Sequence, residues 1–310
     1  MTLHLGITPW HLNPPTASGI GDQAAFAEAS GFQSFWLPEN HFGDGALPDP
    51  LMLLASAATA TSKIQLATTS YLLTLRNPLQ AAEQVAVLDQ LSGGRVLLGV
   101  GRGYAPEMLR AFHVPVAEKR QIFAWTLDLM QKAWSGEAIS LDGDPEHAVM
   151  VYPRPVQQPH PPIWVAAFGP KALAQAGRMG LPYLSSPMES LQTLANNYRR
   201  HREASLAENI RPAEAVPLMR TVYVSHDKQE IAQLRQRVET EVENSRLQPD
   251  ESLDDWTLIG DPAFVRDGIQ RYQEALGMTH MVVTRLRLPG LAEAQLRKSV
   301  ALLAESVLGK

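Results

Sequence analysis

The chain has 310 residues, of which 45% are apolar and 19% charged, and its formal net charge is −5. This size allows a large hydrophobic core, and the weakly acidic balance gives no indication of a nucleic-acid or membrane partner. Because the sequence contains no cysteine, disulfides, thiolate nucleophiles and cysteine-ligated metals are excluded. The chain starts with a strand-like segment, without signal-peptide features or a membrane-spanning apolar run, so we expect a soluble cytoplasmic protein.

Short apolar runs alternate along the chain with helical patterns, an order typical of parallel strands covered by helices. The segments that predict strands are residues 3–8, 34–37, 64–70, 96–100, 162–167, 183–186, 216–224 and 280–285. The segments with helical periodicity are residues 22–30, 50–61, 79–91, 118–134, 170–179, 189–208, 228–244, 262–276 and 293–308. Residues 249–259 predict irregular structure.

Eight strand–helix units in a chain of this length predict an α/β fold of the closed (β/α)8 barrel type. We expect one barrel domain over residues 1–310. The segment 135–161 is rich in proline, glycine and aspartate and follows the fourth predicted helix. Since the alternation resumes after it, we interpret it as an inserted loop and not as a linker between domains.

The segment from Ser92 to Tyr104 carries the strongest functional signal. A turn leads into a short apolar strand that ends in alternating glycines, with Arg102 between Gly101 and Gly103. Glycine lets the backbone approach a ligand closely, and the guanidinium fork suits a phosphate. We therefore predict a site for a phosphorylated cofactor, although an ordinary surface arginine remains the alternative. The spacing does not match G-x-G-x-x-G, which disfavours a Rossmann dinucleotide site.

Polar residues also follow the second predicted strand, where barrel enzymes place active-site groups. Glu39, Asn40 and His41 stand there in sequence. An imidazole titrates near neutral pH and suits general acid–base chemistry, whereas a core histidine bonded to backbone is the alternative. A metal site formed with Asp44 or Asp49 is disfavoured because no second histidine stands at ligand spacing.

After the fifth predicted strand, Phe168-Gly169-Pro170-Lys171 begins a helix with proline in its first turn. The free N–H groups at such a helix start suit an anion. A plain strand-to-helix turn without a ligand is an equally good interpretation. The sequence has no G-x-S-x-G nucleophile elbow, so an α/β-hydrolase is excluded.

Taken in order, these residues resemble the luciferase-like monooxygenase superfamily, the bacterial luciferase barrel. The resemblance extends over essentially the whole chain. Its densest parts are residues 31–42, 88–95, 101–104 with the following helix, 153–169 and 259–262. It implies a barrel that binds reduced FMN or, in some members, the deazaflavin coenzyme F-420.

The resemblance also implies roles by position. Arg102 would hold the cofactor phosphate, and a non-prolyl cis peptide would join Thr69 to Ser70 beneath the flavin ring. Glu39, Asn40 and His41 would lie near the reactive face of the ring as candidate catalytic residues. The other residues implied at the cofactor are Gly101, Gly103, Tyr104, Phe168, Gly169, Lys171 and Ala172.

This chain departs from luciferase at several of these positions. The catalytic histidine of luciferase aligns with Asn40, and its reactive cysteine aligns with Gly101. An acidic residue and a serine near the phosphate align with Phe168 and Gly169. We therefore expect a chemistry that differs from luciferase's own, with His41 as a substitute acid or base.

From the resemblance we expect a flavin-dependent oxidoreductase, a two-component monooxygenase that uses reduced FMN and O₂ on a small organic substrate. A separate NAD(P)H:flavin reductase would supply the reduced flavin. The first alternative is a coenzyme F-420-dependent hydride-transfer oxidoreductase, and the second is a non-catalytic flavin-binding protein. We also expect a homodimer, formed by the alanine-rich stretches at residues 50–60 and 79–91, with packing against the barrel as the alternative explanation of these stretches.

Overall fold

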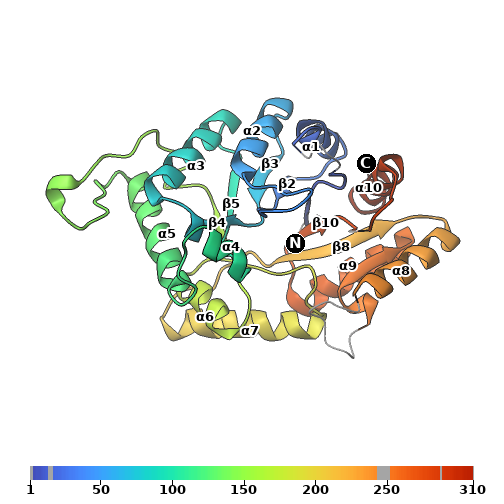
Figure 1. Ribbon diagram of the computed structural model, residues 1–310. Helices are drawn as coiled ribbons and strands as arrows, with labels where there is room; N and C mark the ends of the chain where they lie inside the picture. The colour runs from blue at the N-terminus through green and yellow to red at the C-terminus, as the bar shows by residue number, and fades with distance from the viewer. Residues whose placement is uncertain (1–2, 13–16, 243–251, 287, 310) are drawn as a thin grey trace. The chain divides into compact units, whose positions relative to one another are not determined.

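The computed structural model describes residues 3–12, 17–242, 252–286 and 288–309 (Figure 1). They form two compact units. The terminal unit comprises Met1–Asn13, Ala25–Trp36 and Ala167–Lys310. The middle unit comprises Pro14–Ala24 and Leu37–Ala166. Both units consist of parallel strands alternating with helices, which confirms the predicted α/β class.

The middle unit is organised around one buried strand. Its strands are β3 (Gln65–Thr68), β4 (Tyr71–Leu72), β5 (Val96–Gly101) and β6 (Ile163–Ala166). Strands β3 and β4 follow one another along one edge of β5, and β6 pairs with β5 as well, all in parallel. Every residue of β5 is buried, as expected of a central strand in a parallel sheet.

The helices of the middle unit begin with strong sequence signals. They are α2 (Pro50–Ala60), α3 (Pro78–Ser92), α4 (Pro106–Ala111) and α5 (Lys119–Ser135), with short 3₁₀ turns η1 (Leu73–Leu75) and η2 (Pro145–His147). Asp49 caps α2 and Asn77 caps α3, each followed by a proline in the first turn. Gly93 and Gly136 end α3 and α5 in the left-handed conformation.

The terminal unit contains a parallel sheet in the order β2-β1-β10-β8-β9. Its strands are β1 (His4–Ile7), β2 (Ser34–Leu37), β7 (Tyr183–Leu184), β8 (Pro217–Val224), β9 (Thr257–Gly260) and β10 (His280–Thr284). Its helices are α6 (Pro170–Arg178), α7 (Leu191–Ala207), α8 (Lys228–Val242), α9 (Pro262–Leu276) and α10 (Glu293–Leu308), with the 3₁₀ turn η3 (Leu253–Asp255). Helix α1 (Ile20–Ala29) runs from the middle unit into the terminal unit.

All eight predicted strands are present. The structure adds β4, α4 and β9, and β9 shows that the expectation of irregular structure at 249–259 was wrong for Thr257–Ile259. Residues 249–251 lie outside the described residues. Closure into a single (β/α)8 barrel stays a prediction.

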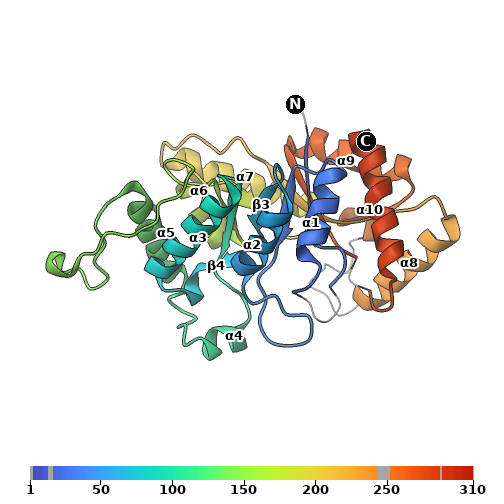
Figure 2. The same ribbon diagram turned by 90° about the horizontal axis from the view of Figure 1, so that it is seen from above.

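Residues 136–161 project from the end of α5 as an arm (Figures 1 and 2). Ile139 and Val149 pair as an antiparallel bridge inside the arm. At its base, Gln157 donates from its backbone N and its side chain to the buried carboxylate of Asp89, at 2.9 and 2.7 Å. That the arm is an insertion in the fold stays a prediction.

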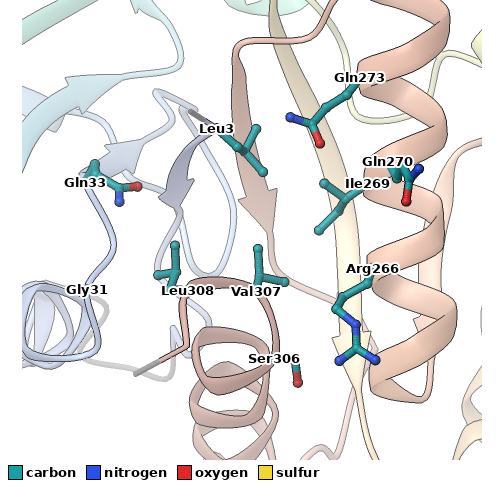
Figure 3. A pocket seen from close by; sticks show the side chains of 10 residues that line it. All are labelled: Leu3, Gly31, Gln33, Arg266, Ile269, Gln270, Gln273, Ser306, Val307 and Leu308. Carbon is teal, nitrogen blue, oxygen red and sulfur yellow. The ribbon is translucent and has the colours of Figure 1, made fainter. Parts of the chain in front are cut away.

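A cavity of about 560 Å³ lies at the amino ends of β1 and β2 in the terminal unit (Figure 3). Residues of α9 and the end of α10 face one another across it. It is lined by Leu3, Gly31, Gln33, Arg266, Ile269, Gln270, Gln273, Ser306, Val307 and Leu308. None of the predicted site residues lines this cavity. In the described part of the chain, no helix is long and apolar enough to cross a membrane.

Candidate functional site

The loop that leaves β5 is built around two glycines that cannot be replaced without a clash. A Cβ atom on Gly101 would lie 2.2 Å from the Ser70 hydroxyl oxygen. Gly103 has φ +68°, and a Cβ there would lie 2.6 Å from the end of Met108. Both glycines are therefore explained by close packing against Ser70 and Met108 and, at Gly103, by the positive φ. That a ligand approaches this loop stays a prediction.

Arg102 stands between these glycines and is only 7% exposed. Its Nη1 donates to the backbone oxygen of Ala166 at 3.1 Å, and its guanidinium lies 4.4 Å from the ring centre of Phe123. Burial and, to a smaller extent, the positive charge of Arg120 together lower the pKa of Arg102 to about 10. The side chain thus stays charged at neutral pH and is held in place, which excludes the plain surface arginine.

Two further cations lie beside Arg102, at the start of α5. Lys119 Nζ donates to the backbone oxygen of Gly103 at 3.4 Å. Burial lowers the pKa of Lys119, and the charges of Arg102 and Arg120 lower it as well. We call Arg102, Lys119 and Arg120 the cation cluster. Three mutually repelling positive charges beside the glycine loop form a site suited to an anion.

Sequence reasoning missed Lys119 and Arg120. A signal was present, because they open a helix where positive charge opposes the helix dipole. Cations in that position are unfavourable unless a negative group compensates for them.

Glu39 has a fully buried carboxylate in the middle unit. Its Oε1 accepts from His41 Nε2 at 2.8 Å and from Arg76 Nη2 at 2.9 Å, and its Oε2 accepts from Leu72 N at 2.9 Å. Burial raises the pKa of Glu39, and Arg76 opposes this more than any other neighbour. His41 is therefore paired with a carboxylate, and the alternative of a histidine bonded to backbone was wrong.

Arg76 is a second residue that sequence reasoning missed. Its guanidinium lies 4.4 Å from the ring centre of Tyr71. The Tyr71 hydroxyl donates to Gln84 on α3, and burial raises the pKa of Tyr71 to about 12. The ring is thus a fixed, neutral platform for Arg76, and only the tertiary structure brings the two together with Glu39.

Asn40 is exposed and closes a loop. Its side-chain oxygen accepts from Leu47 N at 3.2 Å, while its own backbone N donates to Leu47 O at 3.1 Å. The rings of the next two residues, His41 and Phe42, both contact the ring of Phe112. The ring centres of His41 and Phe112 are 4.7 Å apart, and Phe42 stacks on Phe112 with ring centres 5.9 Å apart. Phe42 has φ +63° and its ring is exposed.

The peptide bond between Thr69 and Ser70 is cis, where the resemblance implies one. Thr69 N donates to Leu37 O at 2.7 Å, and the Thr68 hydroxyl donates to Gly99 O at 2.7 Å. The Ser70 side chain lies directly beside Gly101, the last residue of β5.

The segment from Tyr71 to Arg76, here the linking segment, touches both halves of the site. Leu72 N and Arg76 bind the Glu39 carboxylate, and the Thr74 hydroxyl donates to the backbone oxygen of Arg102 at 2.8 Å. In the β4–β5 register, Leu72 also stands opposite Gly101. One short piece of chain therefore holds the acid–base pair and the cation cluster.

Phe168, Gly169, Lys171 and Ala172 belong to the terminal unit. Gly169 caps α6 with φ +75°, and Phe168 and Lys171 are exposed. Their place at a cofactor phosphate stays a prediction, as does that of Tyr104, which is exposed after Gly103. Among the residues that the structure describes, no three His, Cys, Asp or Glu side chains gather as metal ligands would.

Residues 3–279 match the family described as luciferase-like monooxygenase. The chain belongs to this family. It is 32% identical over 302 residues to the F420-dependent glucose-6-phosphate dehydrogenase of Kineococcus radiotolerans, covering 85% of this chain and 86% of the relative. It spans only 61% and 63% of the length of two uncharacterized proteins of Sinorhizobium fredii, with which it shares 32% and 33% identity.

Solved structures agree with this assignment. The monooxygenase RslO1 from Streptomyces bottropensis has a TM-score of 0.83 at 26% identity, covering 100% of this chain and 99% of that one. The oxygenating constituent of 3,6-diketocamphane monooxygenase from Pseudomonas putida, in complex with FMN, has a TM-score of 0.80. The two chains are 21% identical, and the similarity covers 100% of this chain and 99% of the monooxygenase chain, which shows a shared fold.

Proposed function

We propose that this protein is a flavin-dependent oxidoreductase, a two-component monooxygenase that uses reduced FMN and O₂ on a small organic substrate. The observation that carries the proposal is the cation cluster beside the loop of Gly101 and Gly103. It is joined through the linking segment to a buried acid–base pair. A cofactor phosphate fits the first feature, and proton transfer during oxidation fits the second.

The chain's own residues would divide the work. Arg102, Lys119 and Arg120 would bind the phosphate, and the glycine backbone would let the cofactor approach closely. Reduced FMN, when bound, supplies the electrons with which O₂ oxidises the substrate. The exposed rings of Phe42 and Phe112 would offer an apolar surface that favours an apolar substrate. His41 would exchange a proton, with Glu39 as its partner.

Family membership and the similarity to RslO1 support this assignment and the closed (β/α)8 barrel that it needs. The reaction requires reduced flavin, and we propose that a separate NAD(P)H:flavin reductase supplies it. We expect no nucleic-acid partner, because nothing in the charge pattern favours one.

A coenzyme F-420-dependent hydride transfer is the second candidate. The relative from Kineococcus radiotolerans favours it, because that F420-dependent dehydrogenase is similar over most of both chains. Coenzyme F-420 also carries a phosphate, so the cation cluster would suit either cofactor. In this case no oxygen is activated, and the Glu39–His41 pair would give or take the proton that accompanies the hydride.

Thermal unfolding with FMN and with F-420, each oxidised and each reduced under anaerobic conditions, tests both candidates. A ligand at 100 times its Kd adds about 2.7 kcal/mol to the free energy of unfolding, which raises the Tm by several degrees. A shift with FMN alone supports the monooxygenase, and a shift with F-420 alone supports hydride transfer. Absence of any shift contradicts both.

An Arg102→Ala variant tests the phosphate assignment. Loss of a charged hydrogen bond costs about 1.5–3 kcal/mol, so the Kd should rise about 10- to 100-fold. Arg199→Ala is the matched control, since Arg199 is exposed on α7 and its side chain bonds locally to Asn196. Equal Kd values for wild type and Arg102→Ala would show that the cation cluster is not the phosphate site.

A further inference from the structure

The two nitrogens of the His41 imidazole have different environments. Nε2 lies 2.8 Å from Glu39 Oε1, so this nitrogen is committed to the carboxylate. Nδ1 makes no hydrogen bond to any residue within 3–12, 17–242, 252–286 or 288–309. The side chain is 7% exposed, and its ring packs against the edge of Phe112. The ring is therefore fixed in orientation with one nitrogen left for another partner.

The Glu39 carboxylate is itself held from three sides. His41 and Arg76 meet at Oε1, and Leu72 N occupies Oε2. If Glu39 is ionised, all three groups donate to its carboxylate. The positive charge of Arg76 favours the ionised form of Glu39. An ionised, acceptor-only Glu39 requires that neutral His41 carry its proton on Nε2.

We propose that Glu39 and Arg76 are positioning residues that fix the tautomer of His41, so that Nδ1 is the nitrogen that exchanges a proton with the bound molecule. The inference rests on the proposed function, because it assigns a role within the same site. Nδ1 takes a proton into its lone pair, and the resulting imidazolium is stabilised by the Glu39 carboxylate. The same nitrogen then returns the proton, and Glu39 stays ionised throughout. The carboxylate–imidazole pair of serine hydrolases follows the same physical logic.

Arg76 decides the direction of the Glu39–His41 hydrogen bond. Loss of the Arg76 charge would favour the protonated form of Glu39, since desolvation disfavours the ionised form. A protonated Glu39 would donate to Nε2, and the imidazole proton would move to Nδ1. Arg76 thus acts on His41 without touching it.

The test is ¹⁵N NMR of the histidine rings of the full-length protein at about pH 9, well above the ordinary imidazole pKa. The protonated and the bare ring nitrogen of a neutral imidazole have well separated shifts. We expect His41 to be protonated on Nε2. His147 is an internal reference, because its Nδ1 lies 2.7 Å from the exposed carboxylate of Asp142 and it should show the opposite tautomer.

Three variants separate positioning from a general structural effect. Arg76→Leu and Glu39→Gln should move the His41 proton wholly or partly to Nδ1, while Arg76→Lys, which keeps the charge, should retain it on Nε2. Asp142→Asn should alter His147 and leave His41 unchanged. The inference is overturned if wild-type His41 is protonated on Nδ1, or if Arg76→Leu and Glu39→Gln both keep the wild-type tautomer. The wild-type spectrum decides alone if a variant does not fold.

Cofactor binding distinguishes this inference from the proposed function. The Kd values for FMN and F-420 should stay within about threefold in these variants, because the cation cluster is unchanged. A wild-type protein with the expected tautomer that binds neither cofactor would refute the proposed function. A protein that binds a cofactor but shows the wrong His41 tautomer would refute the positioning role alone.

Discussion

His280 stacks on His4 across neighbouring parallel strands, with ring centres 4.6 Å apart. Burial and, to a smaller extent, the neighbouring His4 together lower the pKa of His280 to about 4. Since the unfolded chain takes up this proton near pH 6.5, the unfolded state binds more protons between these two values. The fold is therefore fully stabilised above about pH 6.5 and loses this contribution as the pH falls towards 4.

Replacing His280 by glutamine should remove this pH dependence. We expect the wild type to lose about 1–2 kcal/mol between pH 6.5 and 4 through this group, after allowance for partial solvent screening. Urea unfolding of both proteins across this pH range measures the difference. His147→Gln, at an exposed ion pair, is the control and should follow the wild type. A His280→Gln curve parallel to the wild type would contradict the assignment.

Gly101 gives a second prediction for a single residue. An alanine there would place its Cβ 2.2 Å from Ser70 Oγ and 3.0 Å from Ser70 Cβ. Overpacking of this kind costs about 1–3 kcal/mol. Ser70→Gly in the same chain clears both contacts, so a double-mutant cycle in urea should return most of the lost stability. Strictly additive effects of the two substitutions would exclude this contact as the cause.

Elements whose ends are marked by proline or glycine could be predicted from the sequence, whereas two strands that depend on pairing with their neighbours could not. Helix α9 and strand β2 match the predicted bounds, because prolines and glycines mark their ends. Strand β4 has two residues that depend on pairing with β5, and β9 has four after a segment rich in polar residues. Such elements are defined by their neighbours more than by their own composition.

The candidate site likewise contains residues that the sequence could predict and residues that it could not. Arg102 was predictable because glycines flank it, and Glu39 and His41 because they follow a strand. Arg76, the partner of Glu39, comes from a distant segment with no local mark of function. Lys119 was missed although its place at the start of a helix was a signal. Only the fold brings Arg76 to within 2.9 Å of Glu39.

The attachment of the arm depends on Gln157. Its side chain bonds Asp89 at 2.7 Å and Val96 O at 2.8 Å, so Gln157→Ala leaves a buried carboxylate oxygen short of a donor. We expect a loss of about 1–3 kcal/mol and faster proteolysis within residues 136–161. Gln158→Ala is the control, because the Gln158 side chain bonds within the arm, to Pro155 O. Equal cleavage rates for the two variants would count against this anchor.

At the scale of the whole molecule, exposed apolar side chains on α2 and α3 support the expected homodimer. Met52, Val87 and Leu91 are all exposed there, and Leu91 is 58% exposed. We expect sedimentation velocity to show a dimer that Leu91→Glu weakens at least about 30-fold, the effect of losing a central contact worth about 2 kcal/mol. Leu206→Glu on α7 is the matched control and should leave the dimer unchanged, since Leu206 is similarly exposed, at 53%. A monomeric wild type would refute the dimer.

The linking segment gives the site a thermodynamic property that neither half has alone. Its backbone and side chains bind the Glu39 carboxylate and the Arg102 backbone at the same time. Any coupling free energy between an anion at the cation cluster and a proton at the acid–base pair is reciprocal. If a bound cofactor changes the proton affinity of the Glu39–His41 pair by some factor, a bound proton changes the affinity for the cofactor by the same factor. A pH titration of cofactor binding would therefore measure how strongly the two halves communicate, before any substrate is known.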